Sequence, residues 1–149
     1  MKLLITFLFA CFSFLSADWQ TDFNKAKDEA TKENRAILIN FSGSDWCGPC
    51  IRMKKEIFES DAFENYASGN LVLVRADFPR DKKNQLPKEQ TAKNEALADK
   101  YNPDGKFPLT VLVNADGKVL KQWEGLPQKT PGQFVDEIKS VLNGAGNSN

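Results

Sequence analysis

Residues 36–58, AILINFSGSDWCGPCIRMKKEIF, decide the fold of this chain. They open on a nearly continuous apolar run, Ala36–Phe41, which is typical of a strand buried on both faces. A short polar loop leads to Cys47 and Cys50, and the apolar residues that follow recur at helical spacing as far as Phe58. The stretch therefore predicts a buried strand that runs directly into a helix, with a Cys-x-x-Cys motif at the junction.

Outside this stretch, predicted helices and strands alternate along the chain. We expect helices over residues 21–33, 60–66, 88–101 and 131–143, and strands over residues 71–77, 109–114 and 119–123. A crossover of this length makes the strand at 71–77 parallel to the first strand, and Ala115–Lys118 has the composition of a hairpin turn. The order predicts an α/β fold, a three-layer α/β/α sandwich with a mixed central sheet.

Local signals predict how helices begin and which faces they bury. Thr21 or Asp22 can cap the first helix, and Thr130 with Gln133 forms a capping box for the last one. Apolar residues at helical spacing define two buried faces: Trp19, Phe23, Ala26 and Ala30 in the first helix, and Ala92, Ala96, Leu97 and Tyr101 in the helix at 88–101.

The first 17 residues differ from the rest of the chain. Lys2 precedes an uncharged, mostly apolar run that ends at Ala17. This is the pattern of a secretory signal peptide, because the run is shorter than the roughly 18–20 residues that a membrane-spanning helix needs. We therefore expect a signal peptide at 1–17, one domain at 18–143 and a flexible tail at 144–149, in a protein exported to the periplasm or the extracellular space. An uncleaved membrane anchor and a lipidated Cys11 are the alternatives.

The composition excludes several kinds of chemistry. The 149 residues include 20 Lys and Arg, 20 Asp and Glu, three Cys and no His. A net charge of zero gives no electrostatic basis for nucleic-acid binding, and the lack of histidine excludes Ser-His-Asp and Cys-His catalysis and His-ligated metals. Removal of residues 1–17 would take away one base and no acid, so that the net charge becomes −1, and would leave Cys47 and Cys50 as the two cysteines.

Cys47 and Cys50 carry the chemistry that remains. Cys47 lies at the predicted start of a helix, where unpaired N–H groups and the positive helix end favour the thiolate, which is the attacking form. Cys50 lies one turn further on and can displace a substrate from a mixed disulfide with Cys47. A structural bridge fits less well because it closes a very short loop, and a zinc site lacks further cysteine or histidine ligands. The pattern favours a redox-active disulfide, and we expect no metal and no other cofactor.

Four stretches together point to a known family. They are INFSGSDWCGPC at 39–50, Phe107-Pro108 before an apolar strand, Asp116-Gly117-Lys118, and Gly125. Over residues 18–143 the chain resembles the thioredoxin family, and SGSDWCGPC is similar to exported bacterial members of that superfamily. The resemblance implies a thioredoxin-like fold and a thiol–disulfide oxidoreductase with Cys47 and Cys50 as its catalytic residues.

The resemblance also implies a substrate-binding surface around the cysteines. Pro108 would be a cis-proline opposite the disulfide, and the backbone at Phe107 would offer an edge to an extended peptide. The substrate-binding residues would be Trp46, Gly48, Pro49, Phe107, Pro108 and Gly125. Taken without the resemblance, Phe107-Pro108 is interpreted as an ordinary strand start. For Trp46, packing in the core is an equal alternative.

The chain departs from the family pattern at three places. Asn40 stands where the family usually has a buried aspartate that helps to deprotonate the second cysteine, so water or a carboxylate such as Asp45 would have to accept that proton. About a dozen extra residues fall within 78–95, a charged stretch that we expect to be solvated, with partner docking as the alternative. Leu109 follows the proline where threonine is usual.

The residues between the cysteines bear on the direction of electron flow. Gly-Pro is the dipeptide of reducing thioredoxins, whereas oxidases and isomerases of the family usually carry a histidine there, and this chain has none. The sequence therefore favours an exported, monomeric reductase of protein or peptide disulfides, with a membrane thiol reductant as electron donor. A peptide- or partner-binding module that uses the cysteine pair as a slow redox switch is one alternative, and a disulfide isomerase or oxidase is another.

Overall fold

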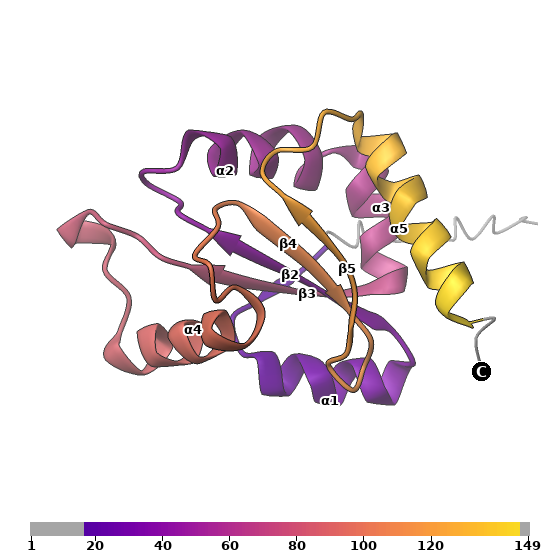
Figure 1. Cartoon of the computed structure of the whole chain (residues 1–149), viewed down its shortest axis with the longest axis horizontal. Helices are drawn as coiled ribbons and strands as arrows, with labels where there is room; N and C mark the ends of the chain where they lie inside the picture. The colour runs from indigo at the N-terminus through magenta and orange to yellow at the C-terminus, as the bar shows by residue number, and fades with distance from the viewer. Residues whose placement is uncertain (1–16, 147–149) are drawn as a thin grey trace, which may run out of the picture.

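A mixed sheet of five strands forms the centre of the structure, a computed structural model that describes residues 17–146 (Figure 1). Within these residues the elements in chain order are β1 (Trp19–Gln20), α1 (Phe23–Glu33), β2 (Ala36–Ser42), α2 (Gly48–Met53), the π-helical segment η1 (Lys54–Phe58), α3 (Asp61–Asn70), β3 (Leu71–Asp77), the short 3₁₀-helix η2 (Lys82–Asn84), α4 (Lys88–Tyr101), β4 (Leu109–Val113), β5 (Val119–Glu124) and α5 (Pro131–Gly146). Apart from Ala17, the predicted signal peptide and Cys11 lie outside the described residues.

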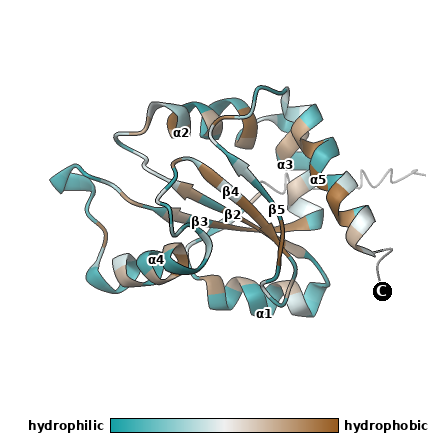
Figure 2. Cartoon of the chain, in the orientation of Figure 1, coloured by the Kyte–Doolittle hydropathy of each residue, from teal (hydrophilic) through white to brown (hydrophobic). Residues whose placement is uncertain are grey.

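Helices cover both faces of this sheet. In Figure 1, α1 and α4 lie along one face and α2, α3 and α5 along the other. The strand order is β1-β3-β2-β4-β5, with β2 parallel to β3 and antiparallel to β4. Hydrophobic residues are concentrated on the central strands, while the helices carry hydrophilic residues as well (Figure 2). These features confirm the predicted three-layer α/β/α sandwich with a mixed sheet.

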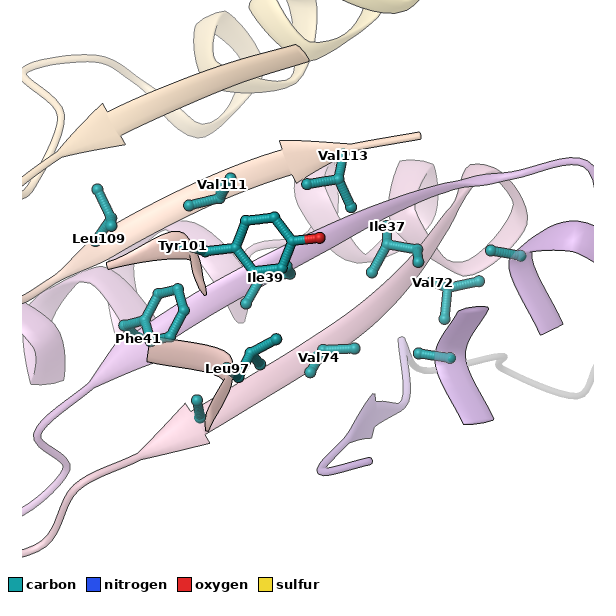
Figure 3. Close-up of a cluster of buried hydrophobic side chains, with 13 residues drawn as sticks. Ile37, Ile39, Phe41, Val72, Val74, Leu97, Tyr101, Leu109, Val111 and Val113 are labelled. Atoms are coloured by element: carbon teal, nitrogen blue, oxygen red, sulfur yellow. The ribbon is translucent and has the colours of Figure 1, made fainter. Parts of the chain in front are cut away.

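β2 supplies side chains to both cores because its residues alternate between the two faces of the sheet. Ile37, Ile39 and Phe41 pack with residues of β3, β4, α1 and α4 (Figure 3). Leu38 points the other way and joins the cluster formed by α2, η1, α3 and α5. All four side chains are fully buried. Asn40 lies on the same face as Leu38, so the alternation places a polar amide in the layer between the sheet and α2.

The predicted helix starts are confirmed at both ends of the domain. The Asp22 carboxylate caps α1 by accepting hydrogen bonds from the N–H groups of Asn24 and Lys25, at 3.0 and 3.1 Å. Thr130 and Gln133 exchange both hydrogen bonds of a capping box ahead of α5.

The placement of Trp19 on the first helix was wrong. Trp19 begins β1, which pairs in parallel with β3 at Leu73. Its indole packs against the Arg75 guanidinium at 4.2 Å and against the Phe58 ring at 4.9 Å. These contacts come from distant parts of the chain, and a strand of two residues is too short to show a period of its own.

Two further helix predictions need correction. α4 buries Asn94 rather than Ala92 and Ala96, which are exposed, because the Asn94 amide donates a 2.9 Å hydrogen bond to the carbonyl at the end of β3. α5 continues past its predicted end at Asn143 to Gly146. A glycine inside a helix costs about 1 kcal/mol, which is too little to stop a helix whose earlier turns are buried in the core.

Phe134 should be a main contributor to the stability of the second core. Its side chain is fully buried, and its ring lies 5.1 Å from that of Trp123. We expect Phe134→Ala to lower the free energy of unfolding by about 3–5 kcal/mol, because the lost contacts leave a cavity. Urea denaturation of the oxidised protein measures this loss. Val119→Ala, at an exposed position, should change stability by less than about 0.5 kcal/mol, and equal losses in the two variants would contradict this packing.

Candidate active site

The two cysteines of the motif form a disulfide at the start of α2. Cys47 is the N-cap residue of that helix, and its Cα lies 5.2 Å from the Cα of Cys50. The Cys50 N–H donates to the Cys47 Sγ at 3.2 Å, so an N–H group of the first helical turn points at the sulfur. The two residues are only 5% and 3% exposed. A partner must therefore reach them across the surface that surrounds the disulfide.

The helix that carries the cysteines is anchored by η1, into which α2 runs directly. The Glu59 N–H donates to the Lys54 carbonyl at 2.9 Å, which is the i to i+5 bond of a π-turn. Ile57 and Phe58 are both buried in the second core. Two adjacent apolar side chains thus fix the end of the segment whose first turn holds the disulfide.

Trp46 forms an aromatic wall next to Cys47. Its ring packs at an angle against Phe107, with centroids 5.4 Å apart, and Phe107 packs in the same way against Phe78. The indole N–H donates to the Phe78 carbonyl at 2.7 Å. Gly43 leaves room for the indole, since a Cβ at that position would lie 2.3 Å from a ring carbon. The backbone and two rings therefore hold the indole in one orientation.

The loop before Cys47 is tied to the end of β3. The Asp77 carboxylate accepts hydrogen bonds from the Ser44 N–H at 2.9 Å and the Ser44 hydroxyl at 2.5 Å. The Phe78 N–H donates to the Ser42 carbonyl at 2.9 Å. Hydrogen bonds thus join the loops that follow β2 and β3 at the carboxyl ends of these two strands.

Asp45 binds the segment that follows β3. Its carboxylate accepts hydrogen bonds from the N–H groups of Arg80 and Asp81, both at 2.9 Å. A third bond, of 3.0 Å, comes from the side-chain amide of Asn84. These bonds, led by that from Arg80, lower the pKa of the Asp45 carboxyl. A carboxylate stabilised in its charged form accepts protons poorly, so Asp45 serves as a loop anchor rather than as the base for Cys50.

Asn40 belongs to a buried polar network. Its side-chain N–H donates to the Thr110 hydroxyl at 3.2 Å, and that hydroxyl lies 3.8 Å from the Met53 sulfur on α2. Asn40 is 3% exposed and Thr110 is fully buried. Neither an amide nor a hydroxyl nor a thioether can take up a proton from a thiol at neutral pH. The network therefore gives the Asn40 amide a hydrogen-bond partner without replacing the missing acid.

Phe107 and Pro108 border the site from the side of β4. The peptide bond between them is cis, as the resemblance implied. The Gly125 N–H donates to the Pro108 carbonyl at 2.9 Å, which holds the loop after β5 next to the proline. Phe107 precedes Leu109, the first residue of β4, and is half-buried.

The predicted substrate-binding residues lie in two places. On the side of β4, the Trp46 and Phe107 rings are in contact, and Gly125 is hydrogen-bonded to Pro108. Gly48 and Pro49 are exposed in the first turn of α2, between the two cysteines.

Sequence reasoning missed Gly43, Phe78 and Arg80 as parts of this wall. The Arg80 guanidinium carbon lies 3.6 Å from the centre of the Trp46 ring, which is within the range of a cation–π contact. One signal was available for Phe78 and Arg80. They follow a strand predicted to be parallel to β2, and sites in such sheets gather where the carboxyl ends of neighbouring strands meet.

A reactive cysteine pair that opens a helix after a buried strand is the mark of a thiol–disulfide oxidoreductase, and comparison with known proteins agrees. A family model described as a thioredoxin-like domain matches residues 23–141. Over 83% of its length the chain is 35% identical to disulfide bond reductase DsbH of Chlamydia pneumoniae, of which it covers 72%. The chain therefore belongs to the thioredoxin family.

Other relatives show how far the similarity extends. Thioredoxin-related protein DsbJ of Chlamydia pneumoniae is 30% identical over 83% of the chain, which covers only 35% of DsbJ. The solved structure of a DsbH oxidoreductase aligns with a TM-score of 0.78 and 31% identity, over 96% of this chain and 94% of that one. A thioredoxin from Thermus thermophilus, at 15% identity, shares the fold with a TM-score of 0.64 over 85% and 88% of the two chains.

Asn40→Asp should speed the step in which Cys50 resolves a mixed disulfide. A buried carboxyl has a raised pKa and could act as general base for the second thiol, with a gain of roughly 10-fold or more. Release of a coloured thiol from a mixed disulfide with Cys47 at pH 7 measures this rate. Asn40→Ser, which brings no acid, should not be faster than wild type. If Asn40→Asp is no faster either, proton removal does not limit the step.

The same variant should show a pH-dependent loss of stability. The ordinary aspartate pKa is about 3.9, and burial would raise it in the folded state. The unfolded carboxyl would then lose its proton first, so stability would fall as the pH rises from about 4 through the raised value. Urea denaturation at pH 4 and pH 8, compared with wild type, measures the difference. A constant difference would show that the carboxyl is hydrated.

Acid should release the loop that Asp45 holds. Because the pKa of Asp45 is lowered in the folded protein, its stabilising contribution is complete above about pH 4 and is lost as the pH falls through the lowered value. In a background with Trp19→Phe and Trp123→Phe, the fluorescence of Trp46 should change in that window, since the same loop accepts the indole hydrogen bond. The background is needed because the Trp123 indole donates to Glu137, whose pKa is lowered as well. Asp45→Asn, which stays neutral, should lack the change, and identical titrations of the two proteins would contradict the anchoring role.

Proposed function

We propose that the protein reduces disulfides of other proteins, with Cys47 as nucleophile and Cys50 as resolving thiol. The observation that carries the proposal is the position of Cys47 at the start of α2, where its sulfur accepts the N–H of Cys50 at 3.2 Å. An N–H group and the positive end of the helix stabilise negative charge on this sulfur. Cys47 is therefore the thiol expected to ionise first and to attack.

The reaction takes place in two exchange steps. The Cys47 thiolate attacks one sulfur of the client disulfide, a bond forms between these two sulfurs, and the other client sulfur leaves as a thiolate that takes up a proton. Cys50 then loses its proton and attacks the Cys47 sulfur, which releases the second client thiol and leaves the Cys47–Cys50 disulfide. Two electrons pass to the client. The disulfide in the structure is the product of this cycle and needs a donor of two electrons to act again.

Two observations support the reducing direction. The dipeptide between the cysteines is Gly48-Pro49, as in reducing thioredoxins, and the chain has no histidine to place there. The relative that is 35% identical is named a disulfide bond reductase. A thioredoxin-like potential of about −270 mV would allow the dithiol to reduce most exposed disulfides. Isomerase or oxidase activity is the alternative.

The pattern of residues 1–17 supports an exported location, periplasmic or extracellular. Within residues 17–146 no helix has the length and apolar character needed to cross a membrane. In an oxidising compartment the cysteines would need an external source of electrons, which we propose to be a membrane thiol reductant. The protein would act as a monomer, with its disulfide as the sole redox group.

A binding module is the second candidate function. The Asn40 amide cannot accept a proton, which favours slow turnover, while the wall of Trp46, Phe107 and Phe78 could hold a peptide without chemistry. In that case the cysteine pair would act as a redox switch for binding.

Cys50→Ser separates these two functions. The variant should form stable mixed disulfides between Cys47 and client proteins, because the resolving thiol is gone, and it should lose insulin reduction down to the uncatalysed rate. Cys47→Ser is the matched control, which should trap nothing and also lose activity. Trapped complexes are measured on non-reducing gels and released by a reductant. If both variants keep wild-type partner binding and no protein reduces insulin, the binding module is correct.

The direction of electron flow has its own measurement. Equilibration of the protein with glutathione buffers should give a midpoint near −270 mV, the thioredoxin value. A midpoint near −120 mV, which is typical of disulfide-inserting enzymes, would overturn the reductase proposal while leaving the two exchange steps intact.

A further inference from the structure

Arg80 places a positive charge on the aromatic wall beside the disulfide. Its guanidinium carbon lies 3.6 Å from the centre of the Trp46 ring, and Trp46 is the residue before Cys47. The Arg80 side chain is exposed. Stacking on the indole uses only a face of the guanidinium, so its N–H groups, which lie in the plane, remain directed toward solvent or a bound molecule.

The backbone fixes where this charge lies. The Arg80 N–H donates to the Asp45 carboxylate at 2.9 Å, and the Trp46 indole donates to the carbonyl of Phe78 at 2.7 Å. Phe78 also packs against Phe107, which contacts Trp46 in turn. The guanidinium and the indole are thus held together before any substrate arrives, which lowers the entropy cost of using them for binding.

The charge of Arg80 has no carboxylate partner within residues 17–146. Of the other arginines in this part of the chain, Arg35 pairs with Glu33 at 3.0 Å and Arg52 with Glu56 at 2.9 Å, while Arg75 is half-buried against Trp19. The carboxylates on the loops after β2 and β3 bond to groups other than the Arg80 guanidinium: Asp45 to the backbone N–H groups of Arg80 and Asp81, Asp77 to Ser44, and Asp81 to Lys83. The Arg80 side chain is therefore free to pair with an anion from outside.

We propose that Arg80 is a specificity-determining residue that binds an acidic side chain of the client next to the disulfide being reduced. The inference rests on the proposed function of the site and narrows its substrates to disulfides flanked by Asp or Glu in an extended segment. A guanidinium binds a carboxylate through two parallel N–H groups, and the client cysteine must approach Cys47 past the indole on which that guanidinium lies. The extra segment after β3 thereby adds charge selection to a site whose other walls are apolar.

Three matched peptides provide the test. Each carries one disulfide with a self-quenched dye pair, and they differ only in having Glu, Gln or Lys beside the cysteines. For the wild-type protein we expect kcat/KM to be on the order of five-fold higher for the Glu than for the Lys peptide, which is the size of a partly exposed ion pair. Arg80→Gln should bring this ratio close to one and Arg80→Glu should invert it. Lys82→Gln, an exposed charge in the same segment, should keep the wild-type ratio.

Three results would overturn the inference. The first is a wild-type ratio near one or below one, which would show that the neighbouring carboxylates dominate the local field. The second is a wild-type ratio that persists in Arg80→Glu. The third is an equal fall in kcat/KM for all three peptides in Arg80→Gln, together with a shift in the pH profile of the Cys47 attack. That result would mean that Arg80 acts on the Cys47 thiolate or on Trp46. Added salt should reduce a true charge preference.

Failure of the reductase proposal would be recognised separately. Peptides with serine in place of cysteine cannot react, and their binding to the oxidised wild-type protein is measured by fluorescence anisotropy. Tighter binding of the Glu form that Arg80→Glu reverses would support charge recognition even if no peptide is reduced. Equal binding of the Glu and Lys forms, together with equal rates, would overturn the role of Arg80 while leaving disulfide reduction intact.

Discussion

The register of β2 against its two neighbours is the constraint on which the site depends. β2 pairs in parallel with β3, with Ser42 opposite Asp77, and antiparallel with β4, with Phe41 opposite Leu109. This pairing brings three segments to one edge of the sheet: the loop into Cys47, the segment from Phe78, and the Phe107-Pro108 turn. A shift of β2 by one residue would exchange its side chains between the two buried cores and move Asn40 into the apolar core with α1 and α4. The packing of both cores therefore also fixes where the disulfide lies relative to its aromatic wall.

Features whose signal lies within a few neighbouring residues could be predicted from the sequence. The strand at Ala36, the Cys-x-x-Cys junction and the Thr130 capping box each have a signal within a few residues. Trp19 and Arg80 do not, because their positions follow from partners far away in the chain. Trp19 belongs to the sheet through its contacts with β3 and Phe58, and Arg80 belongs to the site through Asp45 and Trp46. Hydrophobic periodicity predicts single helices and strands. Contacts between residues far apart in the chain also depend on the register in which the strands pair, and periodicity does not give that register.

The Asn40 network shows a balance between stability and chemistry. An ionised carboxylate in this place would be expensive to bury, whereas the amide is satisfied by the hydroxyl of Thr110 from the neighbouring strand. Leu109, which stands where the family usually has threonine, turns instead into the core with α1 and α4. The hydroxyl therefore comes from one residue further along β4. The chain gains a buried polar pair that is neutral at every physiological pH, and it gives up an internal base for Cys50.

Asp45 joins the loop before the disulfide to the charged segment after β3. Neutral N–H groups of that segment bind its carboxylate and lower its pKa, so these bonds orient the loop while the negative charge of Asp45 remains. The same bonds bring the Arg80 guanidinium over Trp46. One acidic residue thus converts a charged insertion, which on composition alone looks merely solvated, into part of the active-site wall. Because the insertion and the residues before the nucleophile share these bonds, a client that engages Arg80 is positioned by the same contacts that position Cys47.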